Sequence, residues 1–387
     1  MSHVVVLGTH RTKKSALLEL LRYEPPAYYS EAELSEFARR INNLGIFDSV
    51  AIDLQGDVLV VRVEEKWTFI PSFDLVTGST LKDTFILLGG AEYNAFGNGT
   101  TIEGEISYEQ RGINFSLAVR QHDYHPRRWA MGGEVYHSTG ELHFGNPDVA
   151  WTRQQTGGGL SWTAPYGYRS PLRYQVAVDY YREINHRIEG DLLPRDGHAI
   201  GTRMIFAWDQ YLWRDLVASG YQFELEVTPS WLIDAGVAQS RHGATLTVTS
   251  ALPLAKHTVL MNRSLVGVRT RGNVNFSYLL GSQVGVRGLE DLFYRPWTMA
   301  FTNLELRQGL PLARRWAVQG VAFADAAVFE QVDRLGQRAK AGNALSAGAG
   351  VRLLPTFLAQ IVLRVDVARL FLPEQSWFVQ FGTNQYF

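Results

Sequence analysis

The sequence has 387 residues, of which 46% are hydrophobic and 19% charged, and its formal net charge is −1. This apolar content excludes an intrinsically disordered chain. The absence of cysteine excludes disulfide scaffolds, thiolate metal sites and cysteine nucleophiles. The near-neutral charge argues against a nucleic-acid-binding protein, because such proteins carry a basic excess. A helix that crosses a bilayer needs about 20 consecutive apolar residues, and the sequence has no such run.

Residues 1–66 are predicted to form a small mixed domain. Apolar residues recur at helical spacing in two stretches, and Ser30 with Glu33 three residues later is a capping-box signature that opens the second helix. Alternating apolar segments before and after the two helices indicate strands. The element order is therefore β-α-α-β-β. The predicted strands are 3–8, 46–54 and 57–64.

The helical period disappears after Trp67. It is replaced by segments in which apolar residues alternate with polar or small ones, separated by glycine, proline, asparagine and aspartate. This pattern predicts sixteen strands over residues 67–387. Their ranges are 67–78, 82–95, 100–111, 113–123, 128–141, 147–163, 172–186, 198–213, 217–232, 238–252, 256–271, 297–310, 315–329, 345–354, 357–371 and 377–387.

Many alternating strands are compatible with a soluble β-sandwich or propeller as well as with a transmembrane barrel. A propeller should show a repeat of fixed period, and none is visible. Tryptophans stand mainly at predicted strand ends, where a membrane barrel has its interfacial girdles. The even strand count favours a barrel, whose strands must close because lipid cannot satisfy an open edge. The girdle candidates are Trp67, Trp129, Trp162, Trp213, Trp231, Trp297, Trp316 and Trp377.

The predicted strand 357–371 indicates which side faces lipid. Ile361, Leu363, Val365 and Val367 share the phase that suits lipid, and Gln360, Arg364 and Asp366 share the opposite phase. A soluble sheet can show the same alternation. Opposite charges on one face of the strand instead suggest a polar lumen.

The segment 284–291 (VGVRGLED) lies between the predicted strands 256–271 and 297–310. It resembles the VRGF/Y signature on the sixth extracellular loop of the superfamily that contains BamA, TamA and the two-partner-secretion transporters. A lone Arg-Gly pair would be weak evidence, but two further elements of that family follow at the expected distance.

Four residues carry the loop signature. Val286, Arg287 and Gly288 match it, and Leu289 stands where the family has an aromatic residue. The resemblance implies that the loop 281–296 folds back into the lumen, where its arginine meets an acidic residue.

The two further elements lie on predicted strands. Phe323 and Asp325 resemble the family's F-x-D motif, and Glu305 stands where the family usually has an inward-facing carboxylate. Side chains alternate between the two faces of a strand, and this alternation places both acidic residues on the polar faces of their strands, independently of the resemblance. An arginine in a partly dry lumen needs such partners, because an unpaired buried charge is costly. The alternative is that Arg287 is a solvated loop residue and Asp325 a routine lumen charge.

The last residues, QFGTNQYF, resemble the outer-membrane signal that the barrel-assembly machinery recognises. Gln380, Gly382 and the terminal Phe387 fit this signal, whereas Gln385 stands where a hydrophobic residue is usual. The resemblance thus implies the barrel-assembly machinery as a partner.

Residues 1–66 resemble a single POTRA domain, ending in the family-like stretches GIFDSVAI and VEEKW. The resemblance therefore covers the whole chain: a periplasmic POTRA domain, then a 16-stranded barrel over residues 67–387 in the outer membrane of a Gram-negative bacterium. One POTRA domain before sixteen strands resembles the translocator half of patatin-like autotransporters. No G-x-S-x-G elbow of a lipase is present. No export signal precedes Ser2, so we expect this to be a processed form of the chain.

Pro71 in the first barrel strand removes a backbone donor, and prolines in sheets are normally confined to edges or bulges. The partner strand ends in Gly382 and polar residues. We therefore expect a short, weak ladder between the first and last strands, and hypothesise that this seam can part laterally.

The resemblance implies polypeptide translocation or membrane-protein assembly, in which the POTRA domain docks an extended client and the barrel threads it or opens at the seam. A passive solute channel or a lipid-handling barrel is the alternative. We expect no enzymatic activity, cofactor, metal or nucleic-acid partner. His122 and His125, for example, fit no closed zinc pattern. Expected partners are a polypeptide client, outer-membrane lipids and a periplasmic protein at the POTRA domain.

Overall fold

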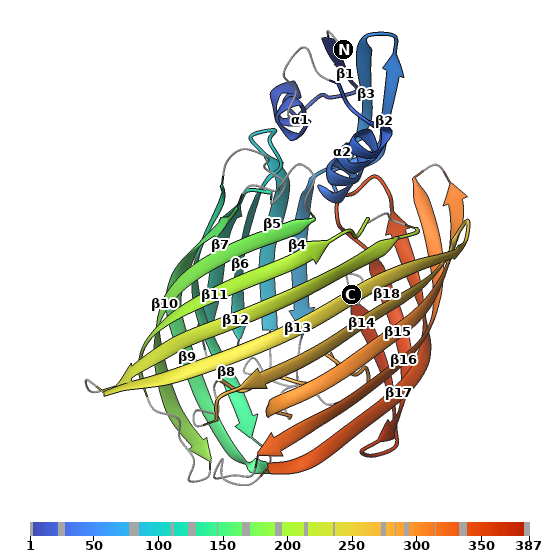
Figure 1. Ribbon diagram of the computed structural model, residues 1–387. Helices are drawn as coiled ribbons and strands as arrows, with labels where there is room; N and C mark the ends of the chain where they lie inside the picture. Colours follow the sequence, from blue (N-terminus) through green and yellow to red (C-terminus); the bar gives the residue numbers. More distant parts are fainter. Residues whose placement is uncertain are drawn as a thin grey trace.

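The computed structural model describes residues 3–21, 28–76, 85–109, 112–122, 129–144, 146–164, 171–189, 196–212, 216–234, 237–271, 276–282, 284–289, 294–313, 315–332 and 339–382. The chain forms a small N-terminal α/β domain and a 16-stranded antiparallel sheet that curls into a barrel (Figure 1). This confirms the predicted fold class. In the described parts of the chain, no helix is long and apolar enough to cross a membrane.

The N-terminal domain has the predicted element order. Its sheet runs β1-β3-β2, with β1 parallel and β2 antiparallel to β3. The capping box is present: the Glu33 N–H donates to Ser30 Oγ at 3.3 Å, and the Ser30 N–H donates to the Glu33 carboxylate at 2.7 Å. The elements are β1 (His3–Leu7), α1 (Lys14–Leu20), α2 (Glu31–Asn43), β2 (Phe47–Gln55) and β3 (Val58–Glu65).

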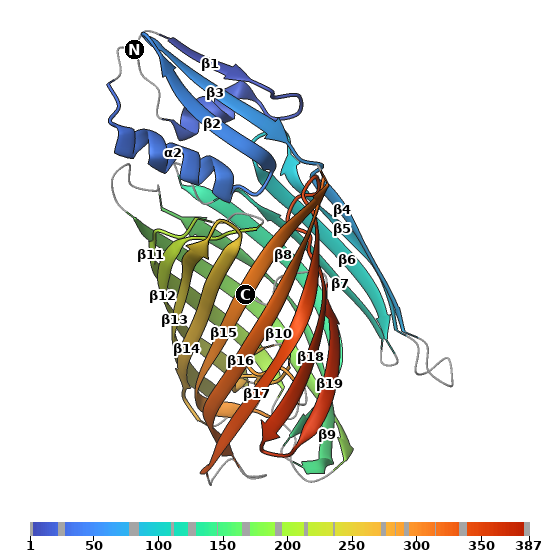
Figure 2. The same cartoon turned by 90° about the vertical axis from the view of Figure 1, so that its right-hand side faces the viewer.

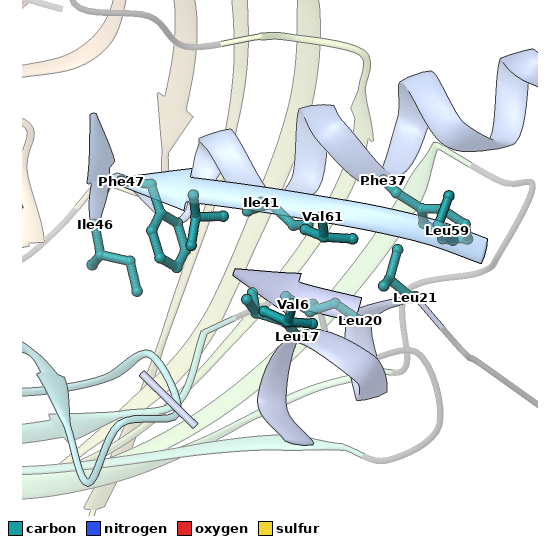
Figure 3. Close-up of a cluster of buried hydrophobic side chains, with 11 residues drawn as sticks. Val6, Leu17, Leu20, Leu21, Phe37, Ile41, Ile46, Phe47, Leu59 and Val61 are labelled. Atoms are coloured by element: carbon teal, nitrogen blue, oxygen red, sulfur yellow. The ribbon is translucent and has the colours of Figure 1, made fainter. Parts of the chain in front are cut away.

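The core of this domain lies between the helices and one face of the sheet (Figure 3). Leu59 and Val61 of β3 point into it, and the intervening side chains of that strand point to the other face because successive residues alternate. Helical spacing aligns Phe37 and Ile41 of α2 against them. The buried members are Val6, Leu17, Leu20, Leu21, Phe37, Ile41, Ile46, Phe47, Leu59, Val61 and Val63.

Each of the sixteen predicted barrel strands overlaps one observed strand, in the same order. The strands are β4 (Phe69–Val76), β5 (Phe85–Ala95), β6 (Thr100–Glu109), β7 (Gly112–Arg120), β8 (Ala130–Phe144), β9 (Asn146–Thr163), β10 (Leu172–Glu189), β11 (Gly197–Asp209), β12 (Gly220–Asp234), β13 (Val237–Ala255), β14 (Thr258–Arg269), β15 (Pro296–Ala313), β16 (Trp316–Val332), β17 (Ala339–Pro355), β18 (Leu363–Leu372) and β19 (Ser376–Gly382).

The two faces of the barrel follow the period-two pattern. Along β15 the odd-numbered residues from Trp297 to Gly309 are buried, while Leu304 and Leu306 are exposed on the outer face. On β18, Val365 and Val367 are exposed and Asp366 is buried, as predicted. Gln360 and Ile361 precede β18, because a turn after Pro355 delays that strand.

Most of the predicted girdle tryptophans face outward, and one prediction was wrong. Trp297 is only 1% exposed, because its parity on β15 turns it toward the lumen. Trp213 lies outside the described residues. The large exposed tryptophans of the girdle set are Trp67, Trp129, Trp231, Trp316 and Trp377, and Trp162 is half-buried.

The N-terminal domain sits over one mouth of the barrel (Figures 1 and 2). The Lys13 N–H donates to the Gly97 carbonyl in the β5–β6 turn at 2.7 Å. From α2, Arg39 and Asn43 donate to the Tyr211 carbonyl, beyond β11, at 2.9 and 2.8 Å. The domain is therefore tied to two separate points of the rim.

The two ends of the barrel sheet, β4 and β19, share no ladder in the described residues. The short ladder expected there is thus not found, and β19 is described only as far as Gly382. Instead, the segment before β4 reaches the turn before β18. The Trp67 N–H donates to the Phe357 carbonyl at 2.7 Å, and the Ala359 N–H donates to the Trp67 carbonyl at 2.9 Å.

Candidate functional site

The loop between β14 and β15 enters the barrel interior. Leu280 and Val286 are 0% exposed, and they pack against side chains of β14 to β18. The Val286 N–H donates to the Gly281 carbonyl at 3.1 Å, which closes a tight turn. The loop therefore presents the side chain of the next residue, Arg287, to the inner wall.

Arg287 is fully buried and meets the residues that the sequence singled out. Its Nε and Nη2 donate to the two carboxylate oxygens of Asp325 at 2.7 and 2.8 Å, and its backbone N–H donates to the same group at 3.1 Å. Its Nη1 donates to Glu305 at 2.5 Å. The guanidinium carbon lies 3.5 Å from the ring centroid of Phe323. The planar fork thus has a bidentate partner, a second carboxylate and an aromatic face.

Three more arginines and one more carboxylate surround this centre. Arg307 contacts Glu305 at 2.6 Å, and Arg352 lies 3.5 Å from the same carboxylate. Arg352 and Arg364 contact Asp366 at 2.5 and 3.1 Å. The cluster thus holds four arginines and three carboxylates, a formal charge of 4 − 3 = +1. We call it the lumen cluster: Arg287, Arg307, Arg352, Arg364, Glu305, Asp325, Asp366 and Asn303.

Asn303 joins the loop to the lumen cluster. Its amide donates to Asp325 at 2.9 Å and to the Gly285 carbonyl at 2.5 Å. Gly285 and Gly288 have φ angles of +125° and +90°, which L side chains rarely adopt. A Cβ on Gly288 would also lie 3.6 Å from Leu370 and Phe378 of β18 and β19. The loop tip thus passes directly over the last two strands.

The remaining predicted residues lie around this loop and the seam. Leu289 is 1% exposed and packs in the apolar cluster beneath the loop. Gln380 of β19 lies 3.5 Å from Ser282 of the loop. A Cβ on Gly382 would lie 2.5 Å from Arg364 Nε, so this glycine makes room for that arginine. Pro71 pairs with Gly90 of β5. Phe387 lies outside the described residues.

Sequence reasoning did not single out Arg352, although parity could have found it. Arg352 shares its β17 phase with Ser346 and with small residues, and Val351 and Leu353 on either side take the other phase. The alternation of side chains along β17 does not, however, identify the carboxylate that pairs with Arg352. Arg352 reaches Asp366 on β18 only because the register sets Arg352 opposite Arg364.

A second anchor of the loop was also missed. Arg269, at the end of β14, stacks 4.0 Å from the ring centroid of Tyr278 and donates to the Phe276 carbonyl at 2.8 Å. The Tyr278 hydroxyl donates to the Ala244 carbonyl at 3.0 Å. Gly267 leaves the space that the tyrosine ring fills, since a Cβ there would lie 2.6 Å from the ring.

Two carboxylates organise the contacts between the domain and the barrel rim. Burial raises the pKa of Glu65, but hydrogen bonds from Thr12 and the Arg11 backbone outweigh this, so its pKa lies below the ordinary 4.5. Burial likewise raises the pKa of Glu36, and hydrogen bonds and ion pairs with Arg39 and Arg40 bring it below 4.5. Glu36 thereby orients Arg39 toward the rim.

No group of three or more histidine, aspartate or glutamate side chains in the described ranges could hold a metal ion. His125, the second member of the histidine pair, lies outside those ranges.

Comparison with known proteins places these features in context. Residues 1–66 match the family model described as "POTRA: Surface antigen variable number repeat". Among solved structures, the chain is similar to BamA from Haemophilus ducreyi lacking POTRA domains 1–3, with 14% identity over 99% of this chain and 84% of that one, at a TM-score of 0.55. The chain has the fold of BamA.

CdiB shares this fold. CdiB from Escherichia coli matches with 13% identity over 98% of this chain and 75% of that one, at a TM-score of 0.64. CdiB from Acinetobacter baumannii matches with 10% identity over 98% and 73%, at a TM-score of 0.61. A search of curated protein sequences found no match. The N-terminal domain is therefore a POTRA domain, joined to a barrel of the BamA and CdiB type.

Proposed function

We propose that the protein resides in the outer membrane of a Gram-negative bacterium and translocates polypeptides across it or assembles them into it. The POTRA match and the fold shared with BamA and CdiB support this general role. Exposed apolar side chains on the outer face, such as Leu304, Leu306 and Val367, suit contact with lipid. In this arrangement the POTRA domain lies in the periplasm.

The ends of the barrel sheet, which share no ladder among the described residues of β4 and β19, are the observation that carries the proposal. A cavity of about 1100 Å³ lies between them, lined by Pro71 and Ser72 of β4 and by Phe381 and Gly382 of β19. Figure 2 shows β4 and β19 on the same side of the barrel, beneath the POTRA domain. Unpaired strand edges are templates for another strand. A passive channel gains nothing from such edges, because lipid leaves their backbone groups unsatisfied.

The POTRA domain supplies a docking edge. Because the sheet order is β1-β3-β2, the outer edge of β2 pairs with no other strand in the described residues. An extended client can add to this edge through main-chain hydrogen bonds, which tolerate many sequences. The domain then delivers the client to the mouth on which it is docked.

The lumen cluster holds the loop in place during this process. Arg287 fixes the loop tip to β15 and β16 through Glu305 and Asp325. The tip also touches β19 near Gln380. The loop is thus coupled to the last strand of the barrel, so that movement of that strand at the seam displaces the loop as well.

Partners follow from the same role. The chain receives a polypeptide client at the POTRA domain, where a periplasmic protein can also dock, and contacts outer-membrane lipids along the barrel. The barrel-assembly machinery inserts it through the C-terminal signal. The near-neutral charge gives no reason to include a nucleic acid.

Site-specific crosslinking in cells tests the proposal. A photo-reactive amino acid replaces Ser49 on the β2 edge or Ser72 on β4, both of which are exposed. The control position is Leu306, exposed on the outer face of β15 and far from the seam in the sheet order. We expect polypeptide adducts from positions 49 and 72 and none from position 306.

Single-channel recording separates the two classes of function. A plugged pore with small, fluctuating conductance agrees with polypeptide transport. A steady, large ohmic conductance, together with no polypeptide adduct at positions 49 and 72, would reject the proposal in favour of a passive channel.

A further inference from the structure

A cavity of about 260 Å³ lies where the POTRA domain meets the barrel. It is lined from β2, from β3, from the segment before β4, and from the β15–β16 and β17–β18 turns. Figure 2 shows the end of β3 and the start of β4 beside the upper ends of β17 and β18. We call this space the junction cavity. The described residues that line it are Asp48, Glu64, Glu65, Trp67, Arg315 and Phe357.

One side of the junction cavity is acidic. Asp48 and Glu64 are both exposed, and Asp48 is the extra residue where a β-bulge interrupts the β2–β3 ladder. Such bulges re-aim side chains and are over-represented beside functional sites. Glu65 is already engaged, because its carboxylate accepts the backbone N–H groups of Arg11 and Thr12 at 2.9 and 2.7 Å. The carboxylates that face the cavity toward a ligand are therefore those of Asp48 and Glu64.

The opposite charge comes from Arg315, which is exposed in the β15–β16 turn. Among the residues that the structure describes, no ion pair joins Arg315 to a carboxylate. Lys66, the neighbouring cation in the chain, is buried. The junction cavity thus holds an acidic side and a guanidinium that line the same space without contacting each other. This separation suits a ligand that carries both an ammonium and an anionic group.

Aromatic residues indicate that the junction cavity lies at the level of the lipid headgroups. Trp67 lines the cavity and is exposed, and Trp316, next to Arg315 in the chain, is exposed on the outer face of β16. Tryptophans of membrane proteins concentrate at this level. The Trp316 ring packs edge to face against Phe357, with the ring centroids 5.6 Å apart. The cavity therefore opens beside the interfacial girdle.

An apolar surface continues from this point along the outer face of the barrel. Leu310 and Leu312 are exposed at the end of β15 that pairs with the start of β16. Val318 is the partner of Leu310 across that ladder. An acyl chain can lie along these side chains while its headgroup occupies the cavity, because both surfaces meet at Trp316.

We propose that the junction cavity binds the headgroup of a phospholipid that carries a primary ammonium group, as ethanolamine phospholipids do. The ammonium donates to Asp48 and Glu64, and the Arg315 guanidinium holds the phosphate. The two aromatic rings of the lining pack beside the ammonium. Because the carboxylates belong to the POTRA domain and the arginine to the barrel, the lipid bridges the two. This inference rests on the proposed position in the outer membrane and is independent of polypeptide transport.

Native mass spectrometry of the full chain in neutral detergent tests the site. The probe is phosphatidylethanolamine, and the reference lipid is phosphatidylglycerol with the same acyl chains, which has the phosphate and lacks the ammonium. The cavity variants are Arg315→Gln and Asp48→Asn. Two controls remove the same charges elsewhere: Arg120→Gln in the barrel, where Arg120 pairs with two glutamates, and Asp53→Asn on the same strand as Asp48.

We expect the wild type to retain phosphatidylethanolamine in preference to phosphatidylglycerol. Retention of phosphatidylethanolamine should be roughly tenfold weaker in Arg315→Gln, also weaker in Asp48→Asn, and unchanged in both controls. Without lipid, both cavity variants should unfold at the wild-type temperature, because the substituted side chains are exposed. With phosphatidylethanolamine, the wild type should gain more heat resistance than either cavity variant.

The two cavity variants distinguish a zwitterion from a simple ion. A simple cation, such as the lysine side chain of a peptide, would bind Arg315→Gln more tightly than the wild type, because a repelling charge is gone. A simple anion would bind Asp48→Asn more tightly for the same reason. Only a ligand with both charges is weakened by both substitutions.

Three outcomes with these lipids would overturn the proposal. They are equal retention of the two lipids by the wild type, tighter retention of phosphatidylethanolamine by either cavity variant, and an equally large loss in either control. Free phosphoethanolamine provides the last arm. If it binds as tightly as the lipid, the site recognises a soluble zwitterion and the lipid proposal is wrong. None of these measurements involves a polypeptide, so a negative result leaves the proposed transport role untouched.

Discussion

The Arg287→Ala substitution removes the centre of the lumen cluster and leaves one carboxylate without a cation. Asp325 loses both guanidinium bonds, at 2.7 and 2.8 Å, and keeps the Asn303 amide at 2.9 Å and the backbone N–H of position 287. Glu305 is better protected, because Arg307 at 2.6 Å and Arg352 at 3.5 Å remain. Breaking a buried pair by removing one partner costs about 3–5 kcal/mol. We expect that loss in free energy of unfolding, carried mainly by Asp325.

A double variant tests whether Asp325 is the reason. In Arg287→Ala with Asp325→Asn, the orphaned charge is gone, so this protein should be at least about 1 kcal/mol more stable than Arg287→Ala alone. Arg287→Lys should lie between wild type and alanine, because it keeps the charge and loses the bidentate fork. The control Arg120→Ala breaks two exposed pairs, with Glu103 and Glu134, and should cost less than about 1 kcal/mol.

Chemical unfolding in liposomes and the heat-induced shift in gel mobility measure these differences. The reasoning is wrong if Arg287→Ala unfolds like Arg120→Ala, or if removing the Asp325 charge from the Arg287→Ala protein gives no recovery.

Three further predictions concern the seam, the rim and the loop. Trp67 and Leu358 form an isolated β-bridge, and a disulfide between cysteines that replace them should block client crosslinking at position 72 until it is reduced. The chain has no native cysteine that could interfere. Equal crosslinking in the oxidised form would argue against seam opening. The pKa values of Glu65 and Glu36 are lowered, so their contribution to docking is complete above about 4.5 and is lost as pH falls through the folded values. The protection factors of the backbone amides of residues 11–13, that is, their exchange rates corrected for the pH dependence of unprotected amides, should therefore fall between pH 6 and pH 3, and unchanged protection factors would contradict this. Gly288→Ala should destabilise the loop by about 1–2 kcal/mol, because position 288 has a φ of +90°. The control Gly140→Ala should not destabilise the protein, because a Cβ at position 140 would meet open space. Equal unfolding midpoints of the two variants would count against a strained loop tip.

Much of the architecture was predictable because a strand is a local pattern. Alternation of apolar and polar residues located all sixteen barrel strands, and the same alternation placed Glu305, Asp325 and Asp366 on the inner face. Trp297 shows the limit of position-based reasoning. It stands at a strand end like the girdle tryptophans, but its parity turns it inward.

The ion pairs inside the barrel were harder to predict from the sequence. Arg287 was expected to meet Glu305 and Asp325 through the family resemblance, and the structure brings these three residues together. The part played by Arg352 and Asp366 did not emerge, because their contact depends on the register between two strands. The second loop anchor, Arg269 with Tyr278, depends on a space left by Gly267.

The sequence alone determined the number of strands, the face on which each side chain lies, and the order of the POTRA domain and the barrel. These follow from periods of two and 3.6 residues, which are properties of neighbouring positions in the chain. The tertiary structure decided which arginines contact which carboxylates and where the loop touches β19. It also decided that, in the part of the chain that the structure describes, the segment around Trp67 contacts Phe357 while β4 and β19 share no ladder. These features arise from how strands distant in sequence are aligned and curved, and no local pattern encodes that alignment.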